Sequence, residues 1–315
     1  MVAGPLVAHL GYRWLFLVPA AITSAAFLLT WACVPASTRS APSPIPLVPA
    51  GLLSIGVLCL LLAISCGGTW GWSSTRFLSV AIAGPLLIVL WMAWEVRTSR
   101  PFIDLAMLSY RPILAGNALT LLAGFCTFAS FAFTPQFLQT SPAHGYGFGA
   151  TVTQSGFILL PCAAASFLSG FFVGSLAQRL GFRPTLIAGA LLMSSAFLSM
   201  VLWHQQAWQV IASTTAQGFS SGMILAACAT LIVLSVPPGA SATASSINAN
   251  LRTLGGAAGT AILAAILSSS ARAGGVPSEF GYVVAYSVLA VAMLAAAGAA
   301  IAVPALSRPP QIRPG

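Results

Sequence analysis

The fold of this chain is decided by a stretch near its middle, residues 152–203, which reads VTQSGFILLPCAAASFLSGFFVGSLAQRLGFRPTLIAGALLMSSAFLSMVLW. It contains two apolar runs, Val152–Ser175 and Thr185–Trp203. Each has about the 20 residues that a helix needs to cross a bilayer core ~30 Å thick. A short segment with Arg179 and Arg183 joins the runs. This pattern predicts two antiparallel membrane-spanning helices with a basic loop between them.

The same pattern repeats along the chain, and it predicts nine complete spans. Gly, Ala and Ser are frequent within them, and small residues let helices approach closely in lipid. Because an open sheet would leave backbone groups unpaired in lipid, we expect an all-α, polytopic membrane helical bundle. The other seven spans are predicted at Trp14–Val34, Leu47–Cys66, Phe77–Trp94, Ile113–Phe137, Trp208–Val236, Ile247–Ser269 and Tyr282–Val303.

Composition excludes several classes of protein. Apolar residues make up 58% of the 315 residues and charged residues only 5%, too few to cover a soluble globular enzyme. The formal charge of +9 is spread over the chain, without the basic patch of a nucleic-acid binder. The six cysteines stand singly, outside the spacing of zinc or redox sites. We therefore expect no nucleic-acid partner, no metal and no cofactor.

The N-terminus differs from the rest of the chain. Met1–Leu10 is apolar, but ten residues of helix reach only ~15 Å, about half a membrane. The segment also lacks the basic start of a signal peptide. We expect one truncated span here, with Met1 an internal methionine or a late start.

Arginine placement predicts the orientation, because basic loops stay in the cytoplasm. Eight arginines fall on one side and three on the other, which places the C-terminus in the cytoplasm. The basic side has Arg39, Arg97, Arg100, Arg111, Arg179, Arg183, Arg308 and Arg313, and the other has Arg13, Arg76 and Arg272. The use of arginine as the only cation, with abundant Ala and Gly, indicates a GC-rich bacterial gene and hence the bacterial plasma (inner) membrane.

Several short motifs follow one another along the chain. They are Gly4-Pro5 with Gly11-Tyr-Arg-Trp-Leu-Phe-Leu17; Glu95-Val-Arg97 with Pro101-Phe-Ile-Asp104-Leu; Arg111 with Asn117; Phe137-Leu-Gln139 with Gly156-Phe-Ile-Leu-Leu-Pro161; Gly174-Ser-Leu-Ala-Gln-Arg179-Leu-Gly181-Phe-Arg183; and Asn248-Ala-Asn250-Leu-Arg252-Thr-Leu-Gly255-Gly256-Ala-Ala-Gly259-Thr-Ala261. Together they resemble the fourteen-helix drug/proton antiporters of the major facilitator superfamily.

The resemblance implies a division into three parts, with the nine spans as helices six to fourteen. Residues 1–34 would be the end of an N-terminal helix bundle, comprising a truncated helix five and helix six. Residues 35–100 would be two additional central transmembrane helices. Residues 101–315 would form a C-terminal six-helix bundle of two three-helix inverted repeats. Helices one to four, with the family's N-terminal carboxylates, would be missing.

The resemblance also assigns candidate site residues. Gly4, Pro5 and Gly11 would belong to the antiporter motif that bends the fifth helix. Arg179, Gly181 and Arg183 would belong to the cytoplasmic loop that controls the inward-to-outward rocking. From the residues alone, a helix kink and an ordinary positive-inside loop are the alternatives.

Arg252 is the only charge within a predicted span, and such a residue is a functional hypothesis by default. If the span begins near Ser246, Arg252 lies ~9 Å along the helix and can extend back to the interface. The alternative is a gating or substrate-side cation whose carboxylate partner lies outside this chain.

A substrate path is expected to place amides and aromatic rings on a mostly apolar wall. Amides near span ends are also typical of the interface, and phenylalanines of packed or lipid-facing positions. The candidates are Asn117, Phe125, Phe128, Gln136, Gln139, Gln154 and Gln217. Glycines four residues apart predict close helix contacts at Gly170/Gly174, Gly218/Gly222 and Gly255/Gly259.

One enzyme-like pattern is present, the GxSxG of Gly218–Gly222 around Ser220. A nucleophile elbow needs a strand-to-helix turn with a histidine and an acid in reach. This copy lies inside a long apolar span with only His204 nearby, so we expect no enzyme, and catalysis by Ser220 is a minor alternative.

The sequence therefore predicts the C-terminal part of a proton-coupled exporter of drugs or other amphipathic small molecules. Its partners would be the lipid bilayer and, in the complete protein, the substrate and protons. The only acids, Glu95, Asp104 and Glu279, fall at a span end or in loops, so this chain alone is not expected to couple protons. The alternative is a non-transporting remnant, or a membrane subunit that depends on the missing N-terminal helices or on another chain.

Overall fold

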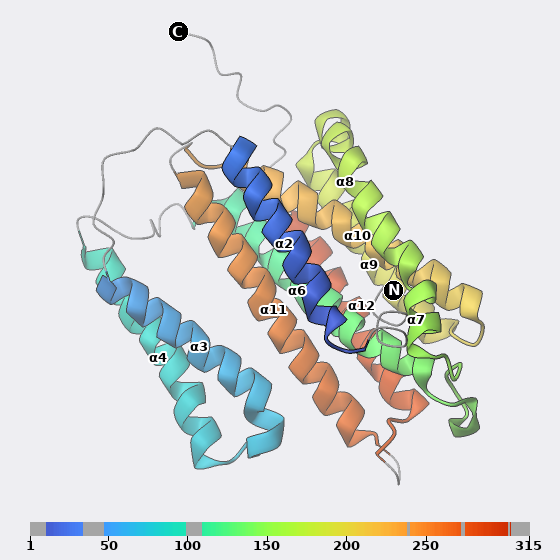
Figure 1. The fold of residues 1–315 in the computed structure, drawn as a ribbon. Helices are drawn as coiled ribbons and strands as arrows, with labels where there is room; N and C mark the ends of the chain where they lie inside the picture. Colours follow the sequence, from blue (N-terminus) through green and yellow to red (C-terminus); the bar gives the residue numbers. More distant parts are fainter. Residues whose placement is uncertain are drawn as a thin grey trace.

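The computed structural model describes residues 11–33, 47–98, 109–237, 240–271, 275–301 and 303. Within these ranges the long elements are all helices, lying side by side as a bundle (Figure 1). Nine helical segments of this part are long and apolar enough to cross a membrane. The all-α membrane bundle and the nine complete spans are confirmed.

The helix ends lie close to the predicted ones. The main differences are that α11 begins at Ser241 instead of Ile247, that α8 continues to Leu180 instead of Ser175, and that α3 continues to Trp70 instead of Cys66. The elements are α2 (Trp14–Cys33), α3 (Leu47–Trp70), α4 (Thr75–Arg97), α6 (Arg111–Gln139), the short 3-10 helix η1 (Pro142–His144), α7 (Val152–Ile158), α8 (Leu160–Leu180), α9 (Phe182–Leu202), α10 (Ala207–Leu234), α11 (Ser241–Ser269) and α12 (Glu279–Ile301).

The predicted span Val152–Ser175 is divided into two helices. Pro161 lies at the start of α8 and has no N–H to donate to the carbonyl of Phe157, so the helical ladder is interrupted at Leu159. α7 and α8 together make the predicted span, which is one membrane-spanning segment interrupted at Leu159.

The last six spans pack in a symmetric pattern. α6 packs along α11, α8 packs along α10, and α9 packs along α12. If α6, α7–α8 and α9 are matched in order to α10, α11 and α12, the α6–α11 contact maps onto the α10–α8 contact. The α9–α12 contact maps onto itself. Two three-helix repeats related by a twofold axis would produce this pattern.

Glycines allow the two equivalent pairs to approach closely. A Cβ on Gly255 of α11 would lie 2.0 Å from the carbonyl oxygen of Leu121 on α6, and one on Gly259 would lie 2.1 Å from that of Phe125. A Cβ on Gly218 of α10 would lie 2.0 Å from the carbonyl oxygen of Cys162 on α8. The helix backbones are therefore in direct contact where α6 crosses α11 and where α8 crosses α10.

The glycine prediction is confirmed for two pairs and wrong for the third. Gly222 completes the α8–α10 contact, since its added Cβ would lie 2.1 Å from the Ser169 Oγ. Gly170 and Gly174 have nothing within 4 Å of an added Cβ, because they lie on an exposed face of α8.

The first three helices lie outside this six-span unit. α3 and α4 pack on each other as a hairpin, and α3 also contacts α11 (Figure 1). In α2 almost every described side chain is exposed, including Phe16, Phe27 and Trp31. The division at residues 1–34, 35–100 and 101–315 stays a prediction.

The glycine crossing at α8–α10 gives a first prediction. Gly218→Ala puts a methyl group onto the Cys162 carbonyl, so we expect a loss of about 1–3 kcal/mol of stability from overpacking. The matched control is Gly170→Ala, where the methyl meets nothing within 4 Å. Thermal unfolding in detergent, followed by a thiol-reactive dye that labels the buried Cys126, Cys162 and Cys228 on unfolding, measures both variants. Equal melting temperatures would contradict the packing described above.

Candidate functional site

A buried chain of hydrogen bonds links three helices of the bundle. The Ser130 hydroxyl of α6 donates to Gln217 Oε1 of α10 at 2.8 Å. Ser130 Oγ also lies 3.2 Å from Thr134 Oγ1, which lies 2.8 Å from the Tyr286 hydroxyl of α12. All four side chains are at least nine-tenths buried. A fully bonded network in a low-dielectric interior fixes the relative positions of the helices that carry it.

The hydroxyl protons have a consistent order along this chain. The Ser130 hydroxyl uses its one proton on Gln217 Oε1, so Thr134 must donate to Ser130, and Tyr286 in turn donates to Thr134. The network ends at the amide nitrogen of Gln217, and Nε2 is buried without an acceptor among the described residues.

A small cavity lined in part by Gln217 lies between α6, α8, α9 and α10. Its volume is about 10 Å³, close to the space of one water molecule. Thr127 and Ser221 carry the other hydroxyls of its wall, and their oxygens lie 3.2 Å apart. The cavity is lined by Thr127, Ser130, Phe131, Cys162, Met193, Gln217, Gly218 and Ser221, a wall without a charged side chain.

A second polar cluster joins α6 to α11. Asn248 Nδ2 donates to Asn117 Oδ1 at 3.0 Å and to Thr120 Oγ1 at 2.9 Å. The three side chains are buried, so Asn117, a predicted path residue, holds two helices together. Asn248 is not among the predicted path residues, although it begins the motif Asn248–Ala261.

Two of the predicted path residues, Gln136 and Gln139, share another cavity. They are exposed at the end of α6 and line a hollow of about 550 Å³ with Thr140, His144 and the segment Gly275–Pro277. This hollow lies at the end of the bundle, so the structure separates these two amides from Gln217.

Beside that end of the bundle, His204 follows α9 and contacts the start of α12. Its Nε2 lies 2.9 Å from Glu279 Oε1. The ring also stacks edge-on against Phe137, which contacts Tyr146 and Tyr282. The prediction that Glu279 lies in a loop was wrong, because α12 begins three residues earlier than the predicted span and Glu279 is its first residue.

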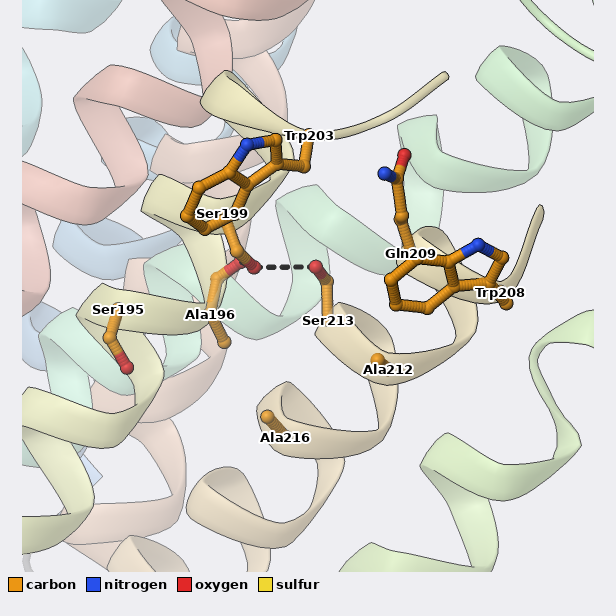
Figure 2. A pocket seen from close by; sticks show the side chains of 9 residues that line it. All are labelled: Ser195, Ala196, Ser199, Trp203, Trp208, Gln209, Ala212, Ser213 and Ala216. Atoms are coloured by element: carbon orange, nitrogen blue, oxygen red, sulfur yellow. Dashed lines mark hydrogen bonds between the residues drawn. The ribbon is translucent and has the colours of Figure 1, made fainter. Parts of the chain in front are cut away.

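A groove of about 510 Å³ opens between α9 and α10. Figure 2 shows Trp203 and Trp208 on its two sides, with a hydrogen bond of 2.5 Å between Ser199 and Ser213 joining the helices. Both indoles are well exposed, as expected for an aromatic belt at a membrane interface.

Arg252 lies deeper in α11 than predicted. Because α11 begins at Ser241, eleven residues precede Arg252, which puts it ~16 Å along the helix and makes a return to the interface harder. Its Nε is buried without a hydrogen-bond partner among the described residues. Gly124 of α6 packs directly on its backbone, since an added Cβ would lie 2.2 Å from the Arg252 carbonyl oxygen.

The predicted gating loop is a turn of one residue. Gly181, with φ +89°, caps the end of α8 and begins α9. A left-handed φ favours glycine at this position. Arg179 is exposed and Arg183 is partly buried. Gly4 and Pro5 lie outside the described residues, and Gly11, with φ +83°, precedes α2.

The remaining predicted path residues, Gln154, Phe125 and Phe128, contribute to helix capping and packing. Gln154 closes a capping box at the start of α7, where its Oε1 accepts from the backbone N–H of Thr151 at 2.9 Å. Phe125 packs against the core, and Phe128, which is 43% exposed, covers Gly256 of α11.

Enzyme chemistry has no support at Ser220. Its hydroxyl donates to the carbonyl of Ala216 at 2.8 Å and is buried inside α10, away from any strand-to-helix turn. No group of three metal-ligating side chains occurs among the residues with described positions.

A comparison with known families decides the class of protein. The model of the Major Facilitator Superfamily matches residues 1–260 and, in a second match, residues 119–314. The chain belongs to the major facilitator superfamily. It is therefore an integral membrane protein of a transporter family and not an enzyme.

Relatives of this superfamily member include resistance and export proteins. Methyl viologen resistance protein SmvA of Salmonella typhimurium is 28% identical over 86% of this chain and 54% of its own length. The tetracenomycin C resistance and export protein of Streptomyces glaucescens is 25% identical over 85% and 49%. Multidrug export protein EmrB of Escherichia coli is 25% identical over 80% and 49%. The chain spans about half the length of these relatives.

A solved structure supports the fold. A D323A mutant of the nucleoside transporter NupG aligns with a TM-score of 0.55 and 12% identity, over 82% of this chain and 83% of that one.

The Asn248 cluster gives a second prediction. Asn248→Ala and Asn117→Ala remove the two ends of one interhelical bond, and we expect a coupling energy of about 0.6–1.7 kcal/mol in a double-mutant cycle. The measurement is unfolding in mixed micelles. Asn250→Ala, an exposed position on the same helix, serves as the control and should not couple to Asn117. Additive effects of Asn248→Ala and Asn117→Ala would refute the bond.

Proposed function

We propose that this chain is the C-terminal part of a proton-coupled exporter in the bacterial inner membrane, which moves drugs or other amphipathic small molecules outward. The observation that carries the proposal is the pair of three-helix groups meeting at an uncharged, buried polar network. Kinship with resistance and export proteins supports the direction and the class of substrate.

Exposed apolar surface supports a longer functional unit. Large side chains are exposed on α6 (Phe128 and Phe131), on α8 (Phe167 and Phe171) and along α2. In the proposal, an N-terminal bundle covers part of this surface, and the substrate path runs between the two bundles. The length of the relatives, about twice the matched region, is consistent with such an arrangement.

Proton coupling requires a carboxylate that titrates within the membrane. Among the described acids, Glu95 is buried but lies in the last turn of α4, and Glu279 contacts His204 at the end of the bundle, so both are near span ends. We therefore assign the coupling carboxylate to the N-terminal helices. Arg252, deep in α11, is the proposed cation that faces such a carboxylate.

The third prediction concerns transport. Cells that lack their own drug exporters are loaded with ethidium, and efflux is compared for the 315-residue chain, for the chain extended by the upstream reading frame, and for an empty vector. We expect pH-driven efflux only from the extended form, because only that form would contain the coupling carboxylate.

Each result of this comparison has a definite meaning. Collapse of efflux on adding a protonophore supports proton coupling. Efflux by the chain alone, above the empty vector, would contradict the assignment of the carboxylate to N-terminal helices. An extended form without efflux, or a stable complex of the chain with another membrane protein in its place, would favour the partner-dependent subunit.

The fourth prediction concerns orientation. Ser141→Cys, in the α6–α7 loop, should react with an impermeant thiol reagent added to whole cells. Leu180→Cys, at the end of α8, should react only after the membrane is inverted. Cys33, Cys59 and Cys66 are replaced beforehand, while Cys126, Cys162 and Cys228 can stay because they are buried. Labelling with the opposite sidedness would exclude a cytoplasmic C-terminus.

A further inference from the structure

Of the two polar atoms in the Gln217 amide, only the oxygen has a hydrogen-bond partner among the described residues. Its side chain is 5% exposed, and its oxygen accepts from Ser130 at 2.8 Å. Its nitrogen has no acceptor among the described residues. Because an unpaired donor buried in a low-dielectric interior costs about 1–3 kcal/mol, a group of this kind calls for a hydrogen-bond acceptor.

The cavity beside this amide offers a second donor. Thr127 and Ser221 lie 3.2 Å apart, and neither hydroxyl bonds to a backbone carbonyl in the part of the chain that the structure covers. Only one proton can lie between the two oxygens, so the other hydroxyl proton is free to point elsewhere. Gln217, with its unpaired amide nitrogen, and the Thr127–Ser221 pair therefore line the same cavity.

The size of the cavity restricts what can enter it. About 10 Å³ admits a single oxygen atom and not a ring. A carbonyl oxygen has two lone pairs and can accept from both donors at once. Phe131, also of the cavity wall, is 55% exposed and offers an aromatic surface for the body of the molecule that carries the oxygen.

Charge also restricts the class of ligand. The cavity wall has no acidic side chain, and the nitrogen of an amide can donate but cannot accept. A permanent cation without oxygen, such as a viologen, gains nothing from these donors.

We propose that Gln217 is a specificity-determining residue that donates to a carbonyl oxygen of the transported molecule, so that carbonyl-bearing aromatic compounds are the preferred substrates. This assignment rests on the proposed export function and deepens it. Gln217 orients the substrate, and Ser130, Thr134 and Tyr286 hold its amide in place through the hydrogen bonds that end at Oε1.

The experiment compares two probes of the same shape on the purified chain in lipid nanodiscs. Anthraquinone carries two carbonyl oxygens, and anthracene carries none. Wild type is expected to bind anthraquinone about tenfold more tightly than anthracene, which corresponds to ~1.4 kcal/mol. Gln217→Met, which keeps the side-chain length and removes the donor, should abolish this preference. Gln205→Met, the same change in the exposed α9–α10 loop, should retain it.

A spectroscopic measurement keeps the test independent of the folding of the variant. The carbonyl stretching band of bound anthraquinone should lie at lower frequency in wild type than in empty nanodiscs, because the oxygen accepts hydrogen bonds. An unshifted band in wild type, equal binding of the two probes, or a preference that survives in folded Gln217→Met would each overturn the assignment.

The binding test and the transport test can fail independently of each other. A carbonyl preference in binding, without efflux of either ethidium or anthraquinone by the extended form, would overturn the export function as the use of the site. Efflux without a carbonyl preference would overturn only the proposed role of Gln217 and would leave the export function intact.

Discussion

The structure depends on how closely helical backbones can approach one another in lipid. Lipid tails are as apolar as leucine, so burying apolar side chains between two spans gains little, and van der Waals contact and hydrogen bonds must hold the bundle. Glycines supply that contact at the α6–α11 and α8–α10 crossings. The two crossings are equivalent in the repeat pattern, so one physical device is used twice in the six-span unit.

The polar network follows from this close packing. Gly218 presses α10 onto the Cys162 carbonyl of α8, and the preceding residue, Gln217, presents its amide to Ser130 of α6. One turn of α10 therefore sets both a backbone contact and a buried hydrogen bond. The network then continues to Tyr286, so three helices meet at uncharged groups in the interior of the bundle.

Charged side chains, in contrast to this uncharged interior, lie mainly at the helix ends. Described arginines lie mostly at helix ends, as in Arg97, Arg111, Arg179 and Arg183, and the His204–Glu279 contact closes one end of the bundle. Arg252 is the exception, since it lies deep in α11 beside the Gly124 contact. A bundle with an uncharged centre and one deep cation is suited to meet acidic groups of another bundle, and this complementarity underlies the proposed export function.

The sequence by itself determined the number of spans, their approximate ends and the family, because lipid imposes long apolar runs that any helix of this kind must show. Only the tertiary structure decided which faces meet. Helices that are apolar on every side carry no periodic signal for their buried face, so Gly170 and Gly174 had the same pattern as Gly218 and Gly222 although only the second pair is packed. The sequence likewise does not distinguish Gln154, which caps α7, from Gln217, which ends a buried network. The roles of Ser130, Thr134 and Tyr286 depend on distant helices that only the tertiary structure brings together.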